Sequence, residues 1–400
     1  MASDELYKLA IEYDKQKLHQ KMYSEQIFGV KLSDGRIAYC SVQGRHDGEN
    51  FALVVYVGSE GLDSLRHSEI NFEDISDNEA FWLNVSQNCL QCVFEEKAAL
   101  TEEELEAEKS FGKRNKIYFR KKYSHPRFLK FTPLCLSRQI EDIEEEKILT
   151  QALSAAIEVS KKFPDNLPRR IKFLNPPPIR KKFPLLTSDG ENYKWTMEQF
   201  PPFRRVKYPA AKLSRSDLKK LSAAKKTGTY CCEIFILPRT EEDDDGIFKF
   251  PVTLVIFDKT KRRSLEIEPV TDYIAAPEKL TAAVAEIFLN EGVPKKILVR
   301  SERTYIFLEK FCEQVGIELG ETEDFHGVDT EEKNLLRELK IESLSNDKFI
   351  VQLLDLLENF SAEELKENLS KELKDLLEEL YNEDIFSYEM EKEVEKIIFD

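Results

Sequence analysis

Tyr230–Leu237 reads YCCEIFIL, an apolar run in which Glu233 is the one charged residue. Short runs of this kind, rich in β-branched and aromatic side chains, are typical of buried strands. Val252–Phe257 (VTLVIF) and Ser264–Pro269 follow as the next two candidate strands, and an acidic loop at Glu241–Asp245 separates the first two runs. We therefore predict three consecutive strands, with a carboxylate on the first.

Helices and short strands alternate after these runs. Pro277 is placed to open a helix that ends near Gly292, because proline fits the first turn of a helix. The later elements are a buried strand at Ile297–Val299, a helix at Thr304–Val315 that stops at Gly316, and a last strand at Ile317–Leu319. The predicted order over residues 229–330 is β-β-β-α-β-α-β, an α/β domain in which crossover units extend a hairpin sheet.

The N-terminal residues show a different pattern. Asp34-Gly35 lies between two β-rich runs, Ile27–Leu32 and Ile37–Val42, which favours a hairpin. Thr101 and Glu104 have the spacing of a capping box that opens a helix. The other expected elements are helices at 3–22 and 140–161 and strands at 51–57, 89–94 and 117–123. We predict one α+β domain over residues 1–160, built around an antiparallel sheet.

Charge divides the rest of the chain into a basic and an acidic part. Residues 161–226 carry 18 basic and 5 acidic side chains, although the net charge of the whole chain is −16. Prolines are frequent between residues 163 and 209, which disfavours long helices, so residues 161–228 are predicted to form a basic, proline-rich connector. Residues 331–400 carry 9 basic and 21 acidic side chains with leucines at helical spacing, which predicts an acidic helical tail.

Composition narrows the class of protein. Hydrophobic residues make up 41% of the chain, enough for packed cores, and no apolar run reaches the ~18 residues of a membrane span. The first residues lack the layout of a signal peptide, and the seven cysteines are scattered, which favours reduced thiols and a cytoplasmic location. Cys89 and Cys92, three apart on a predicted strand, should point to opposite faces and do not suit a zinc site.

The predicted β-β-β-α-β-α-β order, together with Gly292–Val299 (GVPKKILV), resembles the ribonuclease H-like fold of integrases, transposases and many nucleases. Active members of that fold clamp two divalent cations between carboxylates from the first strand, the end of the fourth strand and a later helix. The resemblance implies Glu233, Glu302 and Glu331 as catalytic candidates, and Glu332 is the alternative to Glu331 on the later helix. Arg300 stands where a ligand is expected, and a guanidinium there opposes metal binding, so we predict no metal site.

The chain also resembles a bacterial two-domain family whose domains both have unknown function. The resemblance rests on Tyr39–Gly44 (YCSVQG) and on the region around Pro251–Gly316. It implies no activity and no site residues.

The basic segment is the second functional candidate. Its cations are interleaved with aromatic residues such as Trp195 and Phe203, a combination that suits single-stranded nucleic acid. The candidate contacts are Arg180, Lys181, Lys182, Arg204, Arg205 and Lys207. The favoured interpretation is that the segment is neutralised within the chain, by the acidic tail or the acidic loop, because the net negative charge repels polyanions at long range.

These patterns lead to two hypotheses, beside the third possibility of a small-molecule enzyme with a site assembled between the two domains. The first is a non-enzymatic interaction or regulatory protein with a protein partner, no cofactor and a catalytically inactive ribonuclease H-like module. The alternative is a protein of a mobile element or defence locus that binds nucleic acid through residues 161–226, or processes it with Mg²⁺. Neither hypothesis involves a membrane.

Overall fold

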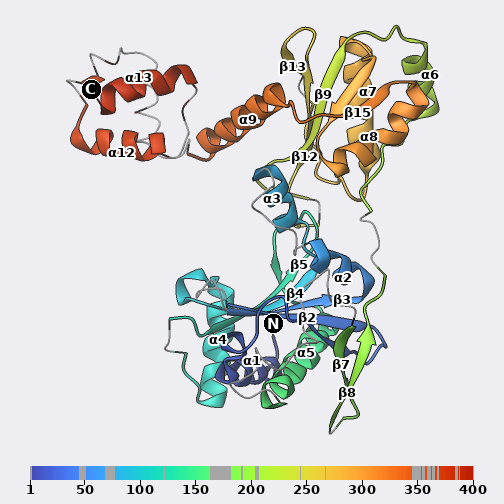
Figure 1. Ribbon diagram of the computed structural model, residues 1–400. Coiled ribbons are helices and arrows are strands. Elements are labelled where there is room, and N and C mark those ends of the chain that lie inside the picture. The colour runs from blue at the N-terminus through green and yellow to red at the C-terminus, as the bar shows by residue number, and fades with distance from the viewer. Residues whose placement is uncertain are drawn as a thin grey trace. The chain divides into compact units, whose positions relative to one another are not determined.

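The computed structural model describes residues 2–44, 51–67, 77–119, 122–162, 182–190, 192–202, 207–243, 245–265, 267–344, 353, 356–357, 362, 365–366, 369–382, 386 and 388–399. The chain divides into two compact units, Met1–Val206 and Lys207–Asp400, and each unit has its own large sheet (Figure 1).

An eight-stranded sheet forms the centre of the first unit, with the order β6-β5-β4-β3-β2-β1-β7-β8. Its strands are β1 (Phe28–Lys31), β2 (Ile37–Gln43), β3 (Phe51–Val57), β4 (Cys89–Glu95), β5 (His125–Phe131), β6 (Arg138–Gln139), β7 (Lys182–Ser188) and β8 (Tyr193–Gln199). All neighbours are antiparallel except β1 and β7, which run parallel. The antiparallel arrangement predicted for residues 1–160 therefore holds for the strands drawn from that region, and the parallel pair makes the sheet as a whole mixed.

The turn between β1 and β2 forms where Asp34-Gly35 predicted it. The backbone N–H of Leu32 donates to the carbonyl of Arg36 at 2.9 Å, which closes the hairpin. Gly35 has a φ of 86°, a left-handed conformation that side-chain-bearing residues rarely adopt. The glycine thus fixes both the turn and the register of the two strands.

The last two strands come from the segment that was predicted to be a connector. Phe183, Leu185 and Leu186 on β7 are almost completely buried, so this apolar run joins the sheet beside β1. Strand β7 is extended and accommodates Pro184. The first unit therefore continues to Val206, beyond the predicted limit at residue 160.

Helices cover both faces of the first sheet. They are α1 (Asp4–Gln16), α2 (Gly58–His67), α3 (Asp77–Val85), α4 (Glu102–Asn115) and α5 (Ile143–Lys162), with short 3₁₀ turns at Leu18–Gln20 and Lys97–Ala99. Side chains of α1, α4 and α5 belong to the apolar layer on one face, and side chains of α2 belong to the layer on the other. Cys92 lies in the first layer and Cys89 in the second, so these thiols point to opposite faces as predicted. Burial raises the pKa of both thiols, that of Cys89 to about 12.

Two local predictions in this unit had different outcomes. The capping box is confirmed, because the Thr101 side chain accepts from the N–H of Glu104 and the Glu104 carboxylate accepts from the N–H of Thr101. The strand predicted at 117–123 is wrong for its described residues, and the strand lies at His125–Phe131 instead. Pro126 pairs with Phe94 of β4, whereas β6 pairs only with Leu129 and Lys130 of β5. The missing N–H of Pro126 therefore removes no hydrogen bond to β6.

The second unit contains a five-stranded sheet of order β13-β12-β9-β14-β15. Its strands are β9 (Thr229–Ile236), β12 (Val252–Asp258), β13 (Arg263–Leu265), β14 (Lys296–Val299) and β15 (Glu318–Glu321). Strand β12 is antiparallel to both of its neighbours, whereas β9, β14 and β15 are parallel. In the acidic loop, β10 (Glu241–Glu242) and β11 (Phe248–Lys249) form a separate small hairpin. The predicted order of elements is otherwise reproduced, with β9 at the centre of the sheet.

Three helices of this unit pack near the central strand. They are α7 (Pro277–Glu291), α8 (Glu302–Val315) and α9 (His326–Leu344), and α6 (Arg215–Ala223) packs against α7 and α8. Residues of α9 pack in one apolar cluster with Cys231 and Phe235 of β9 and with Leu237, which follows the strand. Helix α7 begins with Pro277, as predicted, and α8 ends at Gly316, whose φ of 75° makes the left-handed cap.

Helices account for most of the described residues of the acidic C-terminal region, as predicted. Helices α12 (Lys371–Asn382) and α13 (Tyr388–Ile398) share an apolar cluster with Leu365 and Leu369. The described leucines from Leu365 to Leu380 are therefore buried, wholly or in part, against other residues of the tail. In the part of the chain that the structure describes, no helix is long and apolar enough to cross a membrane.

Candidate functional site

Glu233 lies in the middle of β9 and is 1% exposed. The parallel strand β14 pairs with β9 only as far as Leu298, which is opposite Cys231. If this register continued, Arg300 would lie opposite Glu233. The chain instead leaves the sheet at this level and enters α8, so the neighbour of Glu233 is the start of a helix.

The first turn of α8 supplies hydrogen bonds to the Glu233 carboxylate. The N–H of Ser301 donates to Oε2 at 3.3 Å, and the hydroxyl of Thr304 donates to Oε1 at 3.1 Å. Thr304 Oγ1 also accepts from the backbone N–H of Ile234 at 2.9 Å. Ser301 is the N-cap of α8, so the same turn that starts the helix also holds the buried carboxylate.

Arg303 is the second charge buried at this place, with 2% of its surface exposed. Its Nη2 lies 3.6 Å from Glu233 Oε1 and donates to the carbonyl of Ile234 at 3.1 Å. Burial of a charged group is unfavourable unless an opposite charge and hydrogen bonds compensate it. Glu233 and Arg303 provide that compensation for each other.

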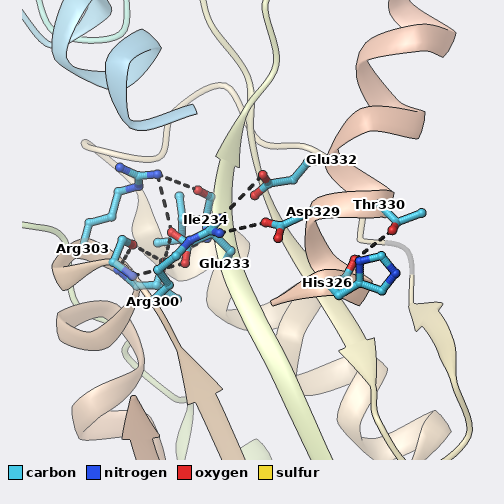
Figure 2. A network of polar contacts seen from close by, with 10 residues as sticks. Glu233, Ile234, Arg300, Arg303, His326, Asp329, Thr330 and Glu332 are labelled. Carbon is cyan, nitrogen blue, oxygen red and sulfur yellow. Dashed lines mark hydrogen bonds and ion pairs between the residues drawn. The ribbon is translucent and has the colours of Figure 1, made fainter. Parts of the chain in front are cut away.

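Arg300 connects the sheet to α9 (Figure 2). Its Nη1 donates to Asp329 Oδ1 at 2.8 Å, and its Nη2 lies 3.8 Å from Glu332 Oε2. The guanidinium also lies 4.9 Å from the ring centre of Phe325. Asp329 and Glu332 are three residues apart, so they occupy one face of α9 and point towards the same guanidinium.

The surroundings of Glu332 shift the pKa of its carboxyl upwards. Burial, reinforced by the nearby carboxylates of Glu233 and Asp329, raises its pKa to about 7, although Arg300 and Arg303 oppose the shift. Its Oε1 is buried and has no hydrogen-bond partner among the described residues. A carboxyl in these surroundings binds a proton near neutral pH, which relieves the repulsion. We name these five side chains, Glu233, Arg300, Arg303, Asp329 and Glu332, the charge cluster.

The structure separates the three carboxylates predicted from sequence. Glu233 belongs to the charge cluster, but Glu302 is exposed at the start of α8. Glu331 accepts a hydrogen bond from Ser264 at 2.8 Å and lines a different hollow, of about 460 Å³, beside β12 and α9. Glu332, the predicted alternative to Glu331, reaches the cluster from α9 together with Asp329.

Two members of the charge cluster were not identified as site residues from sequence. Asp329 precedes Glu332 by three residues, and this spacing on a predicted helix is the signal that could have paired them. Arg303 follows the N-cap at Ser301, but its burial depends on tertiary packing that no local pattern reports. Arg300 was identified, because it follows directly on the fourth strand.

The geometry favours internal charge pairing over metal binding. In the described residues, no group of three or more histidine, cysteine or acidic side chains is arranged to hold a metal ion. Two guanidinium groups already accompany the carboxylates of the cluster. A divalent cation would have to compete with these permanent positive charges for the same oxygens.

The structure describes two of the six basic residues that were predicted as nucleic-acid contacts. Lys182 begins β7 and Lys207 begins the second unit, and both are exposed. The other four lie outside the described residues: Arg180, Lys181, Arg204 and Arg205. The predicted neutralisation of the basic segment within the chain stays a prediction.

Comparison with known families gives a match for each unit. Residues 4–174 match a family model described as a domain of unknown function, DUF7309, and residues 216–336 match a second one, DUF6930. No match was found among curated proteins. The chain therefore joins two domains of unknown function, DUF7309 followed by DUF6930, which confirms its predicted resemblance to a two-domain family of that kind.

Proposed function

We propose that this chain is a non-enzymatic interaction or regulatory protein whose second unit is a catalytically inactive ribonuclease H-like module. The strand order supports the fold part of this proposal. Numbered along the chain without the small β10-β11 hairpin, the five strands are ordered 3-2-1-4-5, and the second strand alone runs opposite to the other four. This sheet, with its first strand at the centre, is consistent with the ribonuclease H-like fold that the order of elements resembles. Fold similarity by itself does not establish activity.

The position of Arg300 carries the functional part of the proposal. In active enzymes of this fold, a carboxylate near the end of the fourth strand helps the first-strand carboxylate to hold the metal ions. Here that place has a guanidinium, which pairs with Asp329 at 2.8 Å and lies 3.8 Å from Glu332. The positive charge that a metal would bring is already supplied by the protein, so the carboxylates are structural.

A nuclease assay tests this assignment directly. The full chain and a Glu233→Ala variant are incubated with single- and double-stranded DNA and RNA, with Mg²⁺ or Mn²⁺. We expect no cleavage above background from either protein. Metal-dependent cleavage by the wild type that disappears in the variant would overturn the proposal.

Nucleic-acid binding is the alternative proposal, and the excess of basic residues between 161 and 226 supports it. Binding through these cations would weaken steeply as salt increases, because each phosphate contact releases counterions. Fluorescence anisotropy with a labelled 20-nucleotide strand at 50 and 200 mM salt measures this effect. Absence of binding at the lower salt concentration removes the alternative.

Partner capture distinguishes the two proposals in a cell extract. The full chain serves as bait, with and without prior nuclease treatment of the extract. A protein partner that is retained after treatment supports the interaction role. Loss of every partner on treatment favours the nucleic-acid alternative.

A further inference from the structure

Strand β8 forms one edge of the eight-stranded sheet and makes a hairpin with β7. It pairs with β7 along its whole length, from Tyr193 to Gln199, and no described strand pairs with its other side. A strand with one unpaired side presents a row of backbone N–H and C=O groups that can accept another strand. The opposite edge of the sheet, β6, has only two residues, so β8 is the longer of the two edges.

The side chains of β8 are more exposed than those of the other strands in this sheet. Lys194, Thr196, Met197, Glu198 and Gln199 are all exposed, and Met197 exposes 43% of its surface. Trp195 packs partly on the apolar core and lies opposite Leu186 of β7. Charged residues on an edge usually discourage pairing with other chains. Here the two charges of the strand have opposite signs.

The sequence of β8 is complementary to itself in one antiparallel register. When Thr196 is opposite Thr196 of a second strand, Lys194 is opposite Glu198, and Trp195 is opposite Met197. Twofold symmetry produces each of these pairs twice. Lys194 and Glu198 lie two residues on either side of Thr196, so they share one face of the strand with it, and Trp195 and Met197 share the other.

We propose that β8 is a self-association surface, which pairs antiparallel with β8 of a second copy of this chain around Thr196. The resulting contact is isologous, as a twofold dimer requires, and it joins the two sheets into one continuous sheet. Two Lys194–Glu198 ion pairs fix the register. This inference concerns the first unit and is independent of the proposed function of the second.

Charge reversal tests the register. Lys194→Glu places like charges opposite each other in both symmetric pairs, and Glu198→Lys does the same with the opposite sign. Sedimentation equilibrium from 1 to 500 μM should show a concentration-dependent dimer for the wild type, and each single variant should raise the dimer Kd by about 10-fold or more. The double variant exchanges the charges, restores opposite pairs and should return the Kd to within about 3-fold of the wild type.

A cysteine at the symmetry point provides a second, independent measurement. In the proposed register, Thr196→Cys places two thiols about 5 Å apart between Cβ atoms, within reach of a disulfide. Gln199→Cys is the matched control, because its two thiols would be about 20 Å apart. Mild oxidation should produce a covalent dimer of the first variant and not of the second.

Each possible result either supports or overturns the proposed pairing of β8 with β8 of a second copy. A wild type that stays monomeric at 500 μM overturns the proposal. A dimer whose Kd is unaffected by both single reversals, or one that crosslinks equally through both cysteines, shows another interface and also overturns it. An unchanged circular dichroism spectrum shows that a variant keeps its fold. We expect this result for each variant, because the substituted side chains are exposed.

Discussion

Removing Arg303 should destabilise the second unit strongly, because it leaves a carboxylate buried without its cation. Arg303→Met retains much of the volume of the side chain and removes the guanidinium 3.6 Å from Glu233 and its hydrogen bond to the carbonyl of Ile234. Both charged residues are at most 2% exposed, so water cannot replace the lost partner. Breaking a buried ion pair in this way costs about 3–5 kcal/mol.

Two spectroscopic signals distinguish unfolding of the first unit from unfolding of the second. Both tryptophans, Trp82 and Trp195, belong to the first unit, so their fluorescence reports on that unit alone. Far-UV circular dichroism reports on both. For a unit of this size, the expected loss lowers the melting temperature by roughly 6–20 °C. We expect this shift in the dichroism transition of the second unit and no shift in the tryptophan transition.

A double-mutant cycle tests the cause of the effect. Glu233→Gln alone should also be costly, because it leaves Arg303 buried without a counter-charge. The double variant Glu233→Gln/Arg303→Met should lose at least ~2 kcal/mol less than the sum of the two single losses. A loss below about 1 kcal/mol for Arg303→Met, or additive effects, would refute the assignment of a mutually dependent buried pair.

Three further outcomes follow from the structure. The folded-state pKa of Glu332 is raised to about 7, so its contribution to stability should be complete below pH ~4.5 and lost as the pH rises to about 7. In urea unfolding measured across this pH range, Glu332→Gln should flatten the dependence of stability on pH. Gly29→Ala should lower the stability of the first unit by about 1–3 kcal/mol, since an added Cβ would clash with the Phe183 ring. Unchanged tryptophan-monitored unfolding of this variant would contradict the contact. Cys135 should be the one thiol that reacts rapidly with Ellman's reagent in the native protein, because the other six cysteines are buried; several fast thiols would show that their cores open readily.

Sequence patterns predicted the features that depend on residues close together in the chain. The Asp34-Gly35 turn, the Thr101 cap and the opposite directions of Cys89 and Cys92 each follow from neighbouring residues alone. The order of strands and helices after residue 229 followed from apolar run length and from helix stop signals such as Gly316.

Long-range pairing produced the features that sequence did not predict. Strand β7 joins β1 across more than 150 residues, and nothing in its own sequence indicates a parallel partner. The distinction between Glu331 and Glu332 depends on how α9 is rotated against the sheet, because adjacent helical residues point about 100° apart. Arg303 is buried only because α8 begins beside the centre of β9. Sequence therefore located the region of the site, while packing decided which charges meet there.

A manganese titration tests the central claim most directly, because that claim is that Arg300 and Arg303 supply the positive charge that a metal would bring to Glu233. Free Mn²⁺ is measured by electron paramagnetic resonance as the ion is added to the full chain and to Glu233→Ala. The charge cluster predicts identical curves with weak, non-stoichiometric binding. One or two tightly bound ions per chain in the wild type, lost in Glu233→Ala, would contradict it.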